Sequence, residues 1–439
     1  MTRTRTTFSF KLDDPAAFKE AALYFYAQET YFMFLESNHG GTGYDTYSSL
    51  LAVGCIDSLS VNYHSAFNKL EAFHQEYQDW VFGYLGYDLK NELEDLSSDN
   101  PDTIAFPDLS FFVPEIILEI TDEQVFLHSY HATEEAAHLI IKQIKGYQFS
   151  KKHTVNTPAQ LIARDHKEEY LDKAQNFLDH IKRGDIYEAN FCTEFYAQHV
   201  TLDSLQAFQE LNVISEPPFA VYARMDHHHV MSASPERYLK KTGTQLISQP
   251  IKGTAKRSLD FIEDENLKEQ LFNDPKERSE NVMIVDLVRN DMSRVAQKGS
   301  VQVQELFGIY SFKQVHQMIS TITAKTLPEL SFIEVIKATF PMGSMTGAPK
   351  ISAMKIIENN ESFKRGLYSG AIGYIKPDGD FDFNVVIRSI LYNAKSQDVS
   401  FSVGSAITAA AHPEKEYEEC LLKAKAMIEV LSHQGVSFD

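Results

Sequence analysis

Short turns between strand-like segments constrain the fold of this chain more than any other feature of its sequence. The turns include Asp226-His227-His228 and Lys376-Pro377-Asp378-Gly379. A turn of this length can join only antiparallel strands, so it excludes a repeating βαβ array. Hydrophobic periodicity predicts helices between the strands. The sequence therefore predicts an α+β fold, with strands at 219–224, 237–240, 245–250, 370–375, 381–392 and 399–403 and helices at 165–184, 275–290, 331–339, 348–359 and 413–432.

The first third of the chain combines a helical pattern at 14–28 with strand patterns at 31–35 and 80–85. The stretch 147–160 carries Lys, Asn and Pro between patterned segments, which is typical of a boundary. We therefore expect an N-terminal region, residues 1–150, and a catalytic region, residues 160–439, that interlock.

Charge and cysteine content exclude several classes of protein. Lys and Arg number 41 and Asp and Glu number 61, so the net charge is −20, which disfavours nucleic acid as a partner. The three cysteines are too few and too scattered for a disulfide framework or a zinc knuckle. The sequence has neither a signal-peptide pattern nor an apolar run long enough to span a bilayer. We expect a cytoplasmic protein that binds neither nucleic acid nor membranes.

Two pairs of carboxylates share faces with apolar residues on two predicted helices. Asp274-Pro275 marks a helix start, and Glu277 and Glu280 follow it with helical spacing. Glu416 and Glu419 are likewise three residues apart, in the helix that begins at Pro413. Carboxylates that point inward from two helices could hold Mg²⁺, which keeps part of its water shell. The alternative is that acids in a first turn only complement the helix dipole.

The segment Gln249-Pro250-Ile251-Lys252-Gly253-Thr254 places a lysine at the end of an apolar strand. In a dry site, burial disfavours the ammonium form, and the free amine of Lys252 is then a nucleophile. Glu236, in Ser234-Pro235-Glu236-Arg237, lies one hairpin upstream and could act as a general acid or base. The alternatives are an exposed lysine at a turn and an ordinary salt bridge.

Two further segments offer groups that could bind an anion. Arg388 interrupts an apolar strand and must be paired, either with a substrate carboxylate or with an internal acid. The loop 341–350 runs into a helix, where its hydroxyl and N–H groups could bind an anion or simply cap the helix.

Taken together and in this order, these segments resemble the chorismate-utilising enzyme family, from about Asp165 to Leu431. The family fold implies large antiparallel sheets packed as a sandwich, with helices on the outside. The resemblance rests on 184–187, 234–237, 250–254, 280–291, 343–350 and 416–419. The segment Leu35-Glu36-Ser37 more weakly resembles part of the family's regulatory tryptophan pocket.

Lys252 discriminates between members of this family. Members that form anthranilate usually carry Ala there, whereas those that form 4-amino-4-deoxychorismate carry Lys. Isochorismate- and salicylate-forming members have a water-activating Lys near position 188, where this chain has Glu188. The resemblance therefore implies amination of chorismate in the route to p-aminobenzoate and folate.

The resemblance also implies a role for each candidate residue. Magnesium on Glu280 and Glu419 would hold the ring carboxylate, with Glu277 and Glu416 adjusting its waters. Glu236 would protonate the departing hydroxyl, and Lys252 would form a covalent adduct that ammonia displaces. The enolpyruvyl carboxylate and the rest of the anion cradle would be bound by Arg388, Tyr368, Gly253, Thr254, Ser344, Gly404 and Ser405.

This sequence departs from the family pattern at a few positions. A glycine-rich strand end is replaced by Ser405-Ala406, and Gln317 stands where anthranilate-forming members have a histidine. The sequence has no cysteine in a Gly-x-Cys-x-Gly context, so the ammonia should come from a separate glutamine amidotransferase. Two alternatives remain, an anthranilate-forming enzyme and a non-catalytic relative that binds chorismate or tryptophan.

Overall fold

The computed structural model describes residues 4–38, 43–44, 47–130, 133–149 and 158–438, and its architecture is a sandwich of two antiparallel sheets. Strands from both ends of the chain meet in the first sheet. Its order is β1 (Thr6–Lys11), β8 (Gln124–Ser129), β7 (Ile116–Ile120), β3 (Ser49–Val53), β2 (Tyr31–Glu36), β12 (Phe219–Met225), β13 (His228–Ser234), β22 (Ser389–Asn393), β23 (Asp398–Thr408), β11 (Glu188–Ala197) and β10 (Ile162–Ala163), and β19 (Gly347–Ala348) pairs with β11.

The second sheet also joins the N-terminal third to the rest of the chain. Its order is β16 (Ile251–Lys256), β18 (Val315–Lys325), β15 (Gln245–Gln249), β14 (Arg237–Thr242), β21 (Phe381–Val385), β20 (Ala371–Ile375), β5 (Val81–Leu85), β6 (Leu109–Val113) and β4 (Asp57–Val61), and β17 (Gln302–Ser311) pairs with β18. A short parallel pair joins β9 (Ala159–Gln160) to β24 (Val436–Ser437). Segments before residue 150 and after residue 158 therefore share both large sheets, while the middle of the predicted boundary, residues 150–157, lies outside the described residues.

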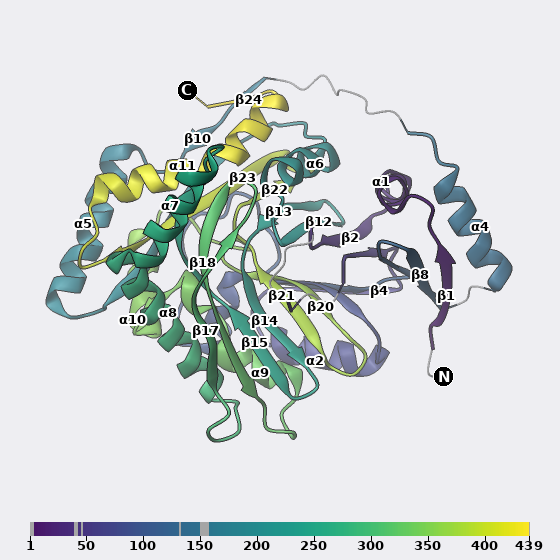
Figure 1. Ribbon diagram of the computed structural model, residues 1–439, viewed down its shortest axis with the longest axis horizontal. Helices are drawn as coiled ribbons and strands as arrows, with labels where there is room; N and C mark the ends of the chain where they lie inside the picture. The colour runs from purple at the N-terminus through teal and green to yellow at the C-terminus, as the bar shows by residue number, and fades with distance from the viewer. Residues whose placement is uncertain (1–3, 39–42, 45–46, 131–132, 150–157, 439) are drawn as a thin grey trace.

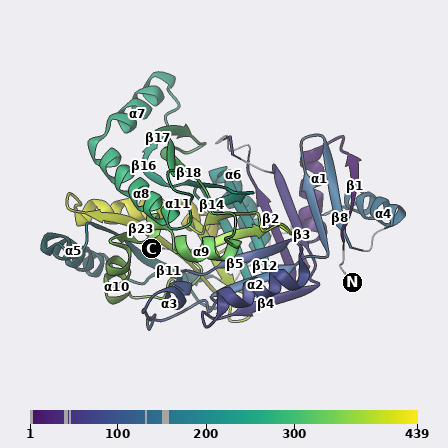
Figure 2. The ribbon, with the colours of Figure 1, turned by 90° about the horizontal axis from the view of Figure 1, so that it is seen from below.

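The helices cover the outer faces of the sandwich. In Figures 1 and 2, α1 and α4 lie beside β1 and β8 at one end of the molecule, and α5 and α11 lie at the other end. Figure 2 also shows α7 and α8 on the side of β16, β17 and β18. The helices are α1 (Pro15–Phe25), α2 (Ala66–Tyr77), α3 (Lys90–Leu93), α4 (Glu134–Lys145), α5 (Lys167–Arg183), α6 (Ser204–Ser215), α7 (Phe261–Asn273), α8 (Pro275–Ser293), α9 (Phe332–Thr339), α10 (Lys350–Asn360) and α11 (Pro413–His433), with 3-10 turns η1 (Tyr87–Leu89) and η2 (Gly343–Met345).

An apolar layer between the sheets holds the sandwich together. It combines Met33 and Val221 from the first sheet with Phe82 and Ile372 from the second, all fully buried. Burial of apolar area in this layer and beneath the helices is the main force that stabilises the fold. The α+β class and the sandwich are thereby confirmed. Within the part of the chain that the structure describes, no helix is long and apolar enough to cross a membrane.

The predicted hairpins are confirmed, but one predicted strand is not continuous. β12 pairs with β13 and β20 pairs with β21, each antiparallel across its short turn. The segment 381–392 was expected to be a single strand, and it is two, because β21 belongs to the second sheet and β22 to the first. Arg388 lies in the crossover with a φ of 52°, which breaks the extended backbone.

Two glycines face each other on neighbouring strands at the centre of the second sheet, and a side chain at either position tests the packing there. A Cβ at Gly373 would lie 2.0 Å from the carbonyl oxygen of Asp382, too close for any side chain. We expect Gly373→Ala to cost about 2 kcal/mol and to lower Tm by about 2 °C. Gly243→Asn is the control, since its site has open space and a φ of 57° that Asn tolerates. Equal thermal stability of Gly373→Ala and the wild type would contradict this account of the packing.

Candidate active site

The candidate site forms where the chain passes from one sheet to the other. Glu236 lies in the crossover from β13 to β14, and Arg388 lies in the crossover from β21 to β22. The two crossovers are joined by backbone hydrogen bonds of 3.0 Å, from Ala233 N–H to the Arg388 carbonyl and from Val385 N–H to the Glu236 carbonyl. Residues 152 positions apart in the sequence are therefore held side by side by main-chain geometry.

Glu236 is a buried carboxyl group whose pKa lies near neutrality. Its side chain accepts a hydrogen bond of 2.6 Å from the Ser344 hydroxyl, at Oε1. Burial raises the pKa of Glu236 to about 7, while Ser344 and the nearby charge of Lys252 lower it. A carboxyl group with such a pKa can donate a proton at neutral pH. Glu236 is buried, as expected, and its role as an acid, like the binding of an anion by Ser344, stays a prediction.

Lys252 lies in β16, half-buried and surrounded by carboxylates. Burial is the largest single influence on its pKa and lowers it. The attraction of Glu188, Glu280, Glu419 and Glu236 outweighs burial, so the pKa of Lys252 is raised. The expectation that burial alone leaves a neutral amine is therefore wrong for the protein without a bound cation, because four acids favour the ammonium form.

The acids of α8 are positioned by a capped helix start. Asp274 accepts hydrogen bonds from the backbone N–H groups of Lys276 and Glu277, and Pro275 occupies the first turn, as the sequence predicts. This start places Glu280 inside the protein, where its Oε1 atom makes no hydrogen bond. α8 packs against β16, so its acids approach the strand that carries Lys252.

The acids of α11 face those of α8. Glu416 is buried at 2% exposure, and Glu419 lies one turn later at an intermediate depth. Burial raises the pKa of Glu416, and Glu419 raises it further. For Glu419, burial is again the largest influence and raises the pKa, but Lys423 together with other cations lowers it below its ordinary value. Acids from the two helices thus approach one another, with Lys276 in contact with one acid of each helix, and their role as metal ligands stays a prediction.

Two lysines that the sequence interpretation missed lie among these acids. The Lys276 ammonium is 3.4 Å from Glu416 Oε1 and 3.7 Å from Glu280 Oε1. Lys423 lies 2.6 Å from Glu419 and also donates to the Gly404 carbonyl at 2.7 Å. The i, i+4 spacings of Lys276 with Glu280 and of Glu419 with Lys423 were the available signal.

The residual charge of the acid cluster suits a cation. Burial raises the pKa of Glu277 to about 7, and Glu280 adds to the effect, so the acids repel one another despite Lys276. Among the described residues, no group of three or more His, Cys, Asp or Glu side chains is arranged to hold a metal ion. Magnesium commonly takes only one or two carboxylates and keeps its waters. The buried Glu280 Oε1 without a hydrogen bond fits such an ion.

Arg388 and Tyr368 provide the complementary positive and polar groups. The Arg388 side chain makes no hydrogen bond or ion pair to any residue that the structure describes, although burial lowers its pKa and Tyr368 and Glu419 attract it. The Tyr368 hydroxyl donates to the Cys192 sulfur at 3.7 Å. A guanidinium that contacts no internal acid can donate two hydrogen bonds to one carboxylate of a ligand. The environment of Arg388 therefore favours a substrate carboxylate over an internal acid as its partner.

The remaining members of the predicted anion cradle differ in position. Gly253 has a φ of 97° and packs against Glu277, whereas Thr254 is exposed in β16. At Gly404 a Cβ would lie 2.6 Å from the Cys192 sulfur, so this glycine permits close pairing of β23 with β11. Ser405 is fully buried, and its hydroxyl lies 3.0 Å from that of Tyr170. The Ser405 side chain therefore faces the core, and substrate binding by this residue stays a prediction.

Glu188 and Gln317, two of the residues that depart from the family pattern, are both buried and incompletely paired. Glu188 is 2% exposed and its Oε2 atom has no hydrogen-bond partner, and the same holds for Oε1 of Gln317. Burial raises the pKa of Glu188, whereas Lys252 lowers it. Glu188 is thus a sixth carboxylate at the site, and among the acids it attracts the Lys252 ammonium most strongly.

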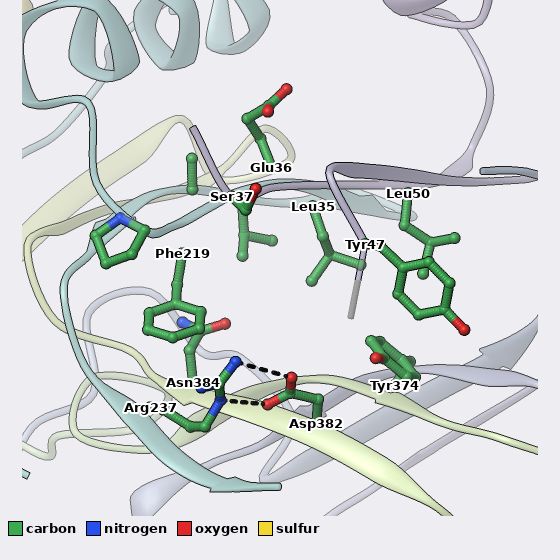
Figure 3. Close-up of a pocket in the computed structure, with 13 residues that line it drawn as sticks. Leu35, Glu36, Ser37, Tyr47, Leu50, Phe219, Arg237, Tyr374, Asp382 and Asn384 are labelled. Carbon is green, nitrogen blue, oxygen red and sulfur yellow. Dashed lines mark hydrogen bonds and ion pairs between the residues drawn. The ribbon is translucent and has the colours of Figure 1, made fainter. Parts of the chain in front are cut away.

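A separate pocket lies between the two sheets, where the weaker sequence likeness was noted. Leu35, Glu36 and Ser37 line it together with residues from β12, β14, β20 and β21. Figure 3 shows Arg237 on the floor of this pocket, where its guanidinium donates two hydrogen bonds to Asp382. Glu236 lies at the candidate active site just before β14 begins, and its neighbour Arg237, the first residue of that strand, lines this pocket.

The two sheets bring together an acid with a pKa near 7, a lysine and two helices that carry carboxylates. This combination is typical of an enzyme that binds a small anion. The chain belongs to the family of chorismate binding enzymes, whose model matches residues 32–429. It is therefore a chorismate-utilising enzyme, and the resemblance noted from its motifs is confirmed.

Individual relatives carry names from two branches of this family. The chain is 33% identical over 359 residues to aminodeoxychorismate synthase component 1 of Escherichia coli, covering 81% of this chain and 77% of that one. It is 32% identical over 431 residues to a probable chloroplastic aminodeoxychorismate synthase of rice, covering 88% of this chain but only 47% of the rice protein. The solved structure of anthranilate synthase component I from Streptococcus pneumoniae superposes with a TM-score of 0.76, at 26% identity, covering 86% and 91% of the two chains.

The raised pKa of Glu236 predicts a pH-dependent stability difference. A carboxyl group with a folded pKa of about 7 and an ordinary value of 4.5 contributes stability below pH 4.5 that is lost as pH rises through 7. We therefore expect Glu236→Gln to match the wild type near pH 4 and to exceed it by about 3 kcal/mol near pH 9. Chemical denaturation at both pH values measures this, and a difference independent of pH would contradict the buried charge.

Proposed function

We propose that this enzyme aminates chorismate and releases 4-amino-4-deoxychorismate, the precursor of p-aminobenzoate in folate synthesis. The observation that carries the proposal is the placement of Lys252 in the electrostatic field of Glu236, an acid with a pKa of about 7. An acid and a primary amine so placed can remove a hydroxyl group and supply a nucleophile to the same ring. The relatives named aminodeoxychorismate synthase support this branch.

The chain's own residues would divide the chemistry between them. Glu236 donates its proton to the ring hydroxyl, which leaves as water, while the Lys252 amine attacks the conjugated ring and forms a covalent adduct. Ammonia then attacks at the C4 position, and a second allylic shift returns the amine to Lys252. The ammonium form of Lys252 must first lose a proton. The Oε2 atom of Glu188 would accept it, since this buried atom has no hydrogen-bond partner.

Substrate binding would use the charges on both sides of the site. Arg388 and Tyr368 would bind the enolpyruvyl carboxylate. Glu280 and Glu419 would hold magnesium, with Glu277 and Glu416 near it, and the ion would neutralise the ring carboxylate and two of the acids that attract the Lys252 proton. A dianion can enter a site with this many carboxylates only when they are offset in this way.

The ammonia would come from a separate glutamine amidotransferase, and the location would be the cytoplasm. Formation of anthranilate is the second candidate, which the structural similarity to anthranilate synthase component I favours. Lys252 and Gln317 argue against it, since anthranilate-forming members usually carry Ala and His at these positions.

The first test removes the proposed nucleophile. We expect Lys252→Ala to lower kcat for chorismate with ammonium and magnesium by at least about 100-fold, while chorismate still binds, because only the adduct-forming step is lost. Lys256→Ala, an exposed lysine of the same strand, is the matched control and should keep wild-type activity. The products are identified by chromatography and mass spectrometry, with and without an added lyase. Full activity of Lys252→Ala, or anthranilate as the product, would overturn the proposal.

The second test addresses the acids. Glu280→Ala and Glu419→Ala should each raise the magnesium concentration needed for half-maximal turnover, by about tenfold or more, because a ligand is removed. The matched control is Glu418→Ala, which changes an exposed residue of α11. Magnesium titrations that match the wild type in both variants would remove these residues as ligands.

A further inference from the structure

We propose that Lys276 is a tethered counter-ion that occupies the carboxylate cluster when magnesium is absent and leaves it when the ion binds. The cluster is defined here as Glu277, Glu280, Glu416 and Glu419. This inference rests on the proposed function, since it takes the cluster to be the magnesium site.

The position of Lys276 carries the inference. Its ammonium lies between the two helices, 3.4 Å from Glu416 Oε1 and 3.7 Å from Glu280 Oε1. Their side chains are 3% and 9% exposed, so the ammonium compensates two buried acids that have no other cation in contact within the described part of the chain. Two buried carboxylates without a counter-charge would repel α8 and α11 from each other.

The side chain of Lys276 is also free to leave. It is 41% exposed, so its ammonium can move into solvent without opening the core. The 3.7 Å separation from Glu280 is longer than a hydrogen bond, and Glu280 Oε1 keeps a vacant acceptor position in a buried setting. A divalent ion attracts carboxylates more strongly than one ammonium, so it can displace the lysine.

This exchange has two consequences. Each magnesium ion that binds must replace an existing ion pair, so Lys276 lowers the affinity for the metal. In return, the acids stay compensated in the protein without metal, so α8 and α11 remain together before the substrate arrives. Lys276 is therefore a positioning residue that sets the affinity for the metal. The residue proposed to bond to the substrate is Lys252.

The test measures metal binding in the absence of chorismate. Isothermal titration calorimetry with Mg²⁺, and electron paramagnetic resonance with Mn²⁺, give the affinities of the wild type and of Lys276→Met. We expect Lys276→Met to bind both ions about tenfold more tightly, because the competing charge is gone. Its Tm without metal should fall below that of the wild type, and saturating Mg²⁺ should restore it.

The matched control is Arg289→Met, which removes one positive charge from an exposed position of the same helix. It should leave the metal affinity and the metal-dependent Tm unchanged. Lys276→Arg retains the charge and should bind Mg²⁺ no more tightly than the wild type, which keeps the inference testable if the neutral variant does not fold.

Metal affinity in Lys276→Met that is equal to or weaker than that of the wild type would overturn the inference, as would tighter binding by Lys276→Arg. Absence of metal binding in all forms would overturn it too, because Lys276 would then be a permanent partner of the acids. The product assay with Lys252→Ala tests the chemistry separately, so failure of the counter-ion role and failure of the amination proposal are distinguishable.

Discussion

The balance between buried carboxylates and two lysines is the physical constraint on which the site depends. Glu188, Glu236 and the four acids of α8 and α11 lie around Lys252 and Lys276, with Lys252 half-buried and Lys276 exposed. Without the lysines, the mutual repulsion of these acids would oppose the packing of α11 near α8. Without the acids, burial would lower the pKa of Lys252 instead. The pKa near 7 of Glu236 follows from the same balance, since burial outweighs the single ammonium nearby.

Backbone topology makes this concentration of charge possible. The chain crosses between the two sheets at Pro235-Glu236 and again at 386–388, and main-chain hydrogen bonds join the two crossings. Strands that diverge at a crossing leave space between the layers, and polar side chains there can meet a ligand without interrupting the apolar layer. The helices that carry the acids come from different layers, because α8 packs on β16 of the second sheet and α11 packs on β23 of the first.

The sequence was sufficient to predict the elements with strong local signals. Asp274-Pro275 and Pro413 begin helices where their capping chemistry indicates, and short turns predict the antiparallel pairs correctly. The break at Arg388 escaped prediction because the apolar pattern continues through the crossing, and a left-handed backbone leaves no mark in periodicity. The orientation of Ser405 and the charge of Lys252 depend on neighbours that are distant in the sequence, namely Tyr170 and four acids from separate elements.

A transient bond between Lys252 and the substrate ring is the central claim, and peptide mass spectrometry tests it most directly. The enzyme with magnesium is mixed with chorismate in the absence of ammonia, quenched in acid and digested. The account predicts a mass increase equal to chorismate minus one water, located on the peptide that contains Lys252 and removed when ammonium is added before the quench. An unmodified Lys252 peptide under conditions in which the same enzyme turns over chorismate with ammonium would contradict it.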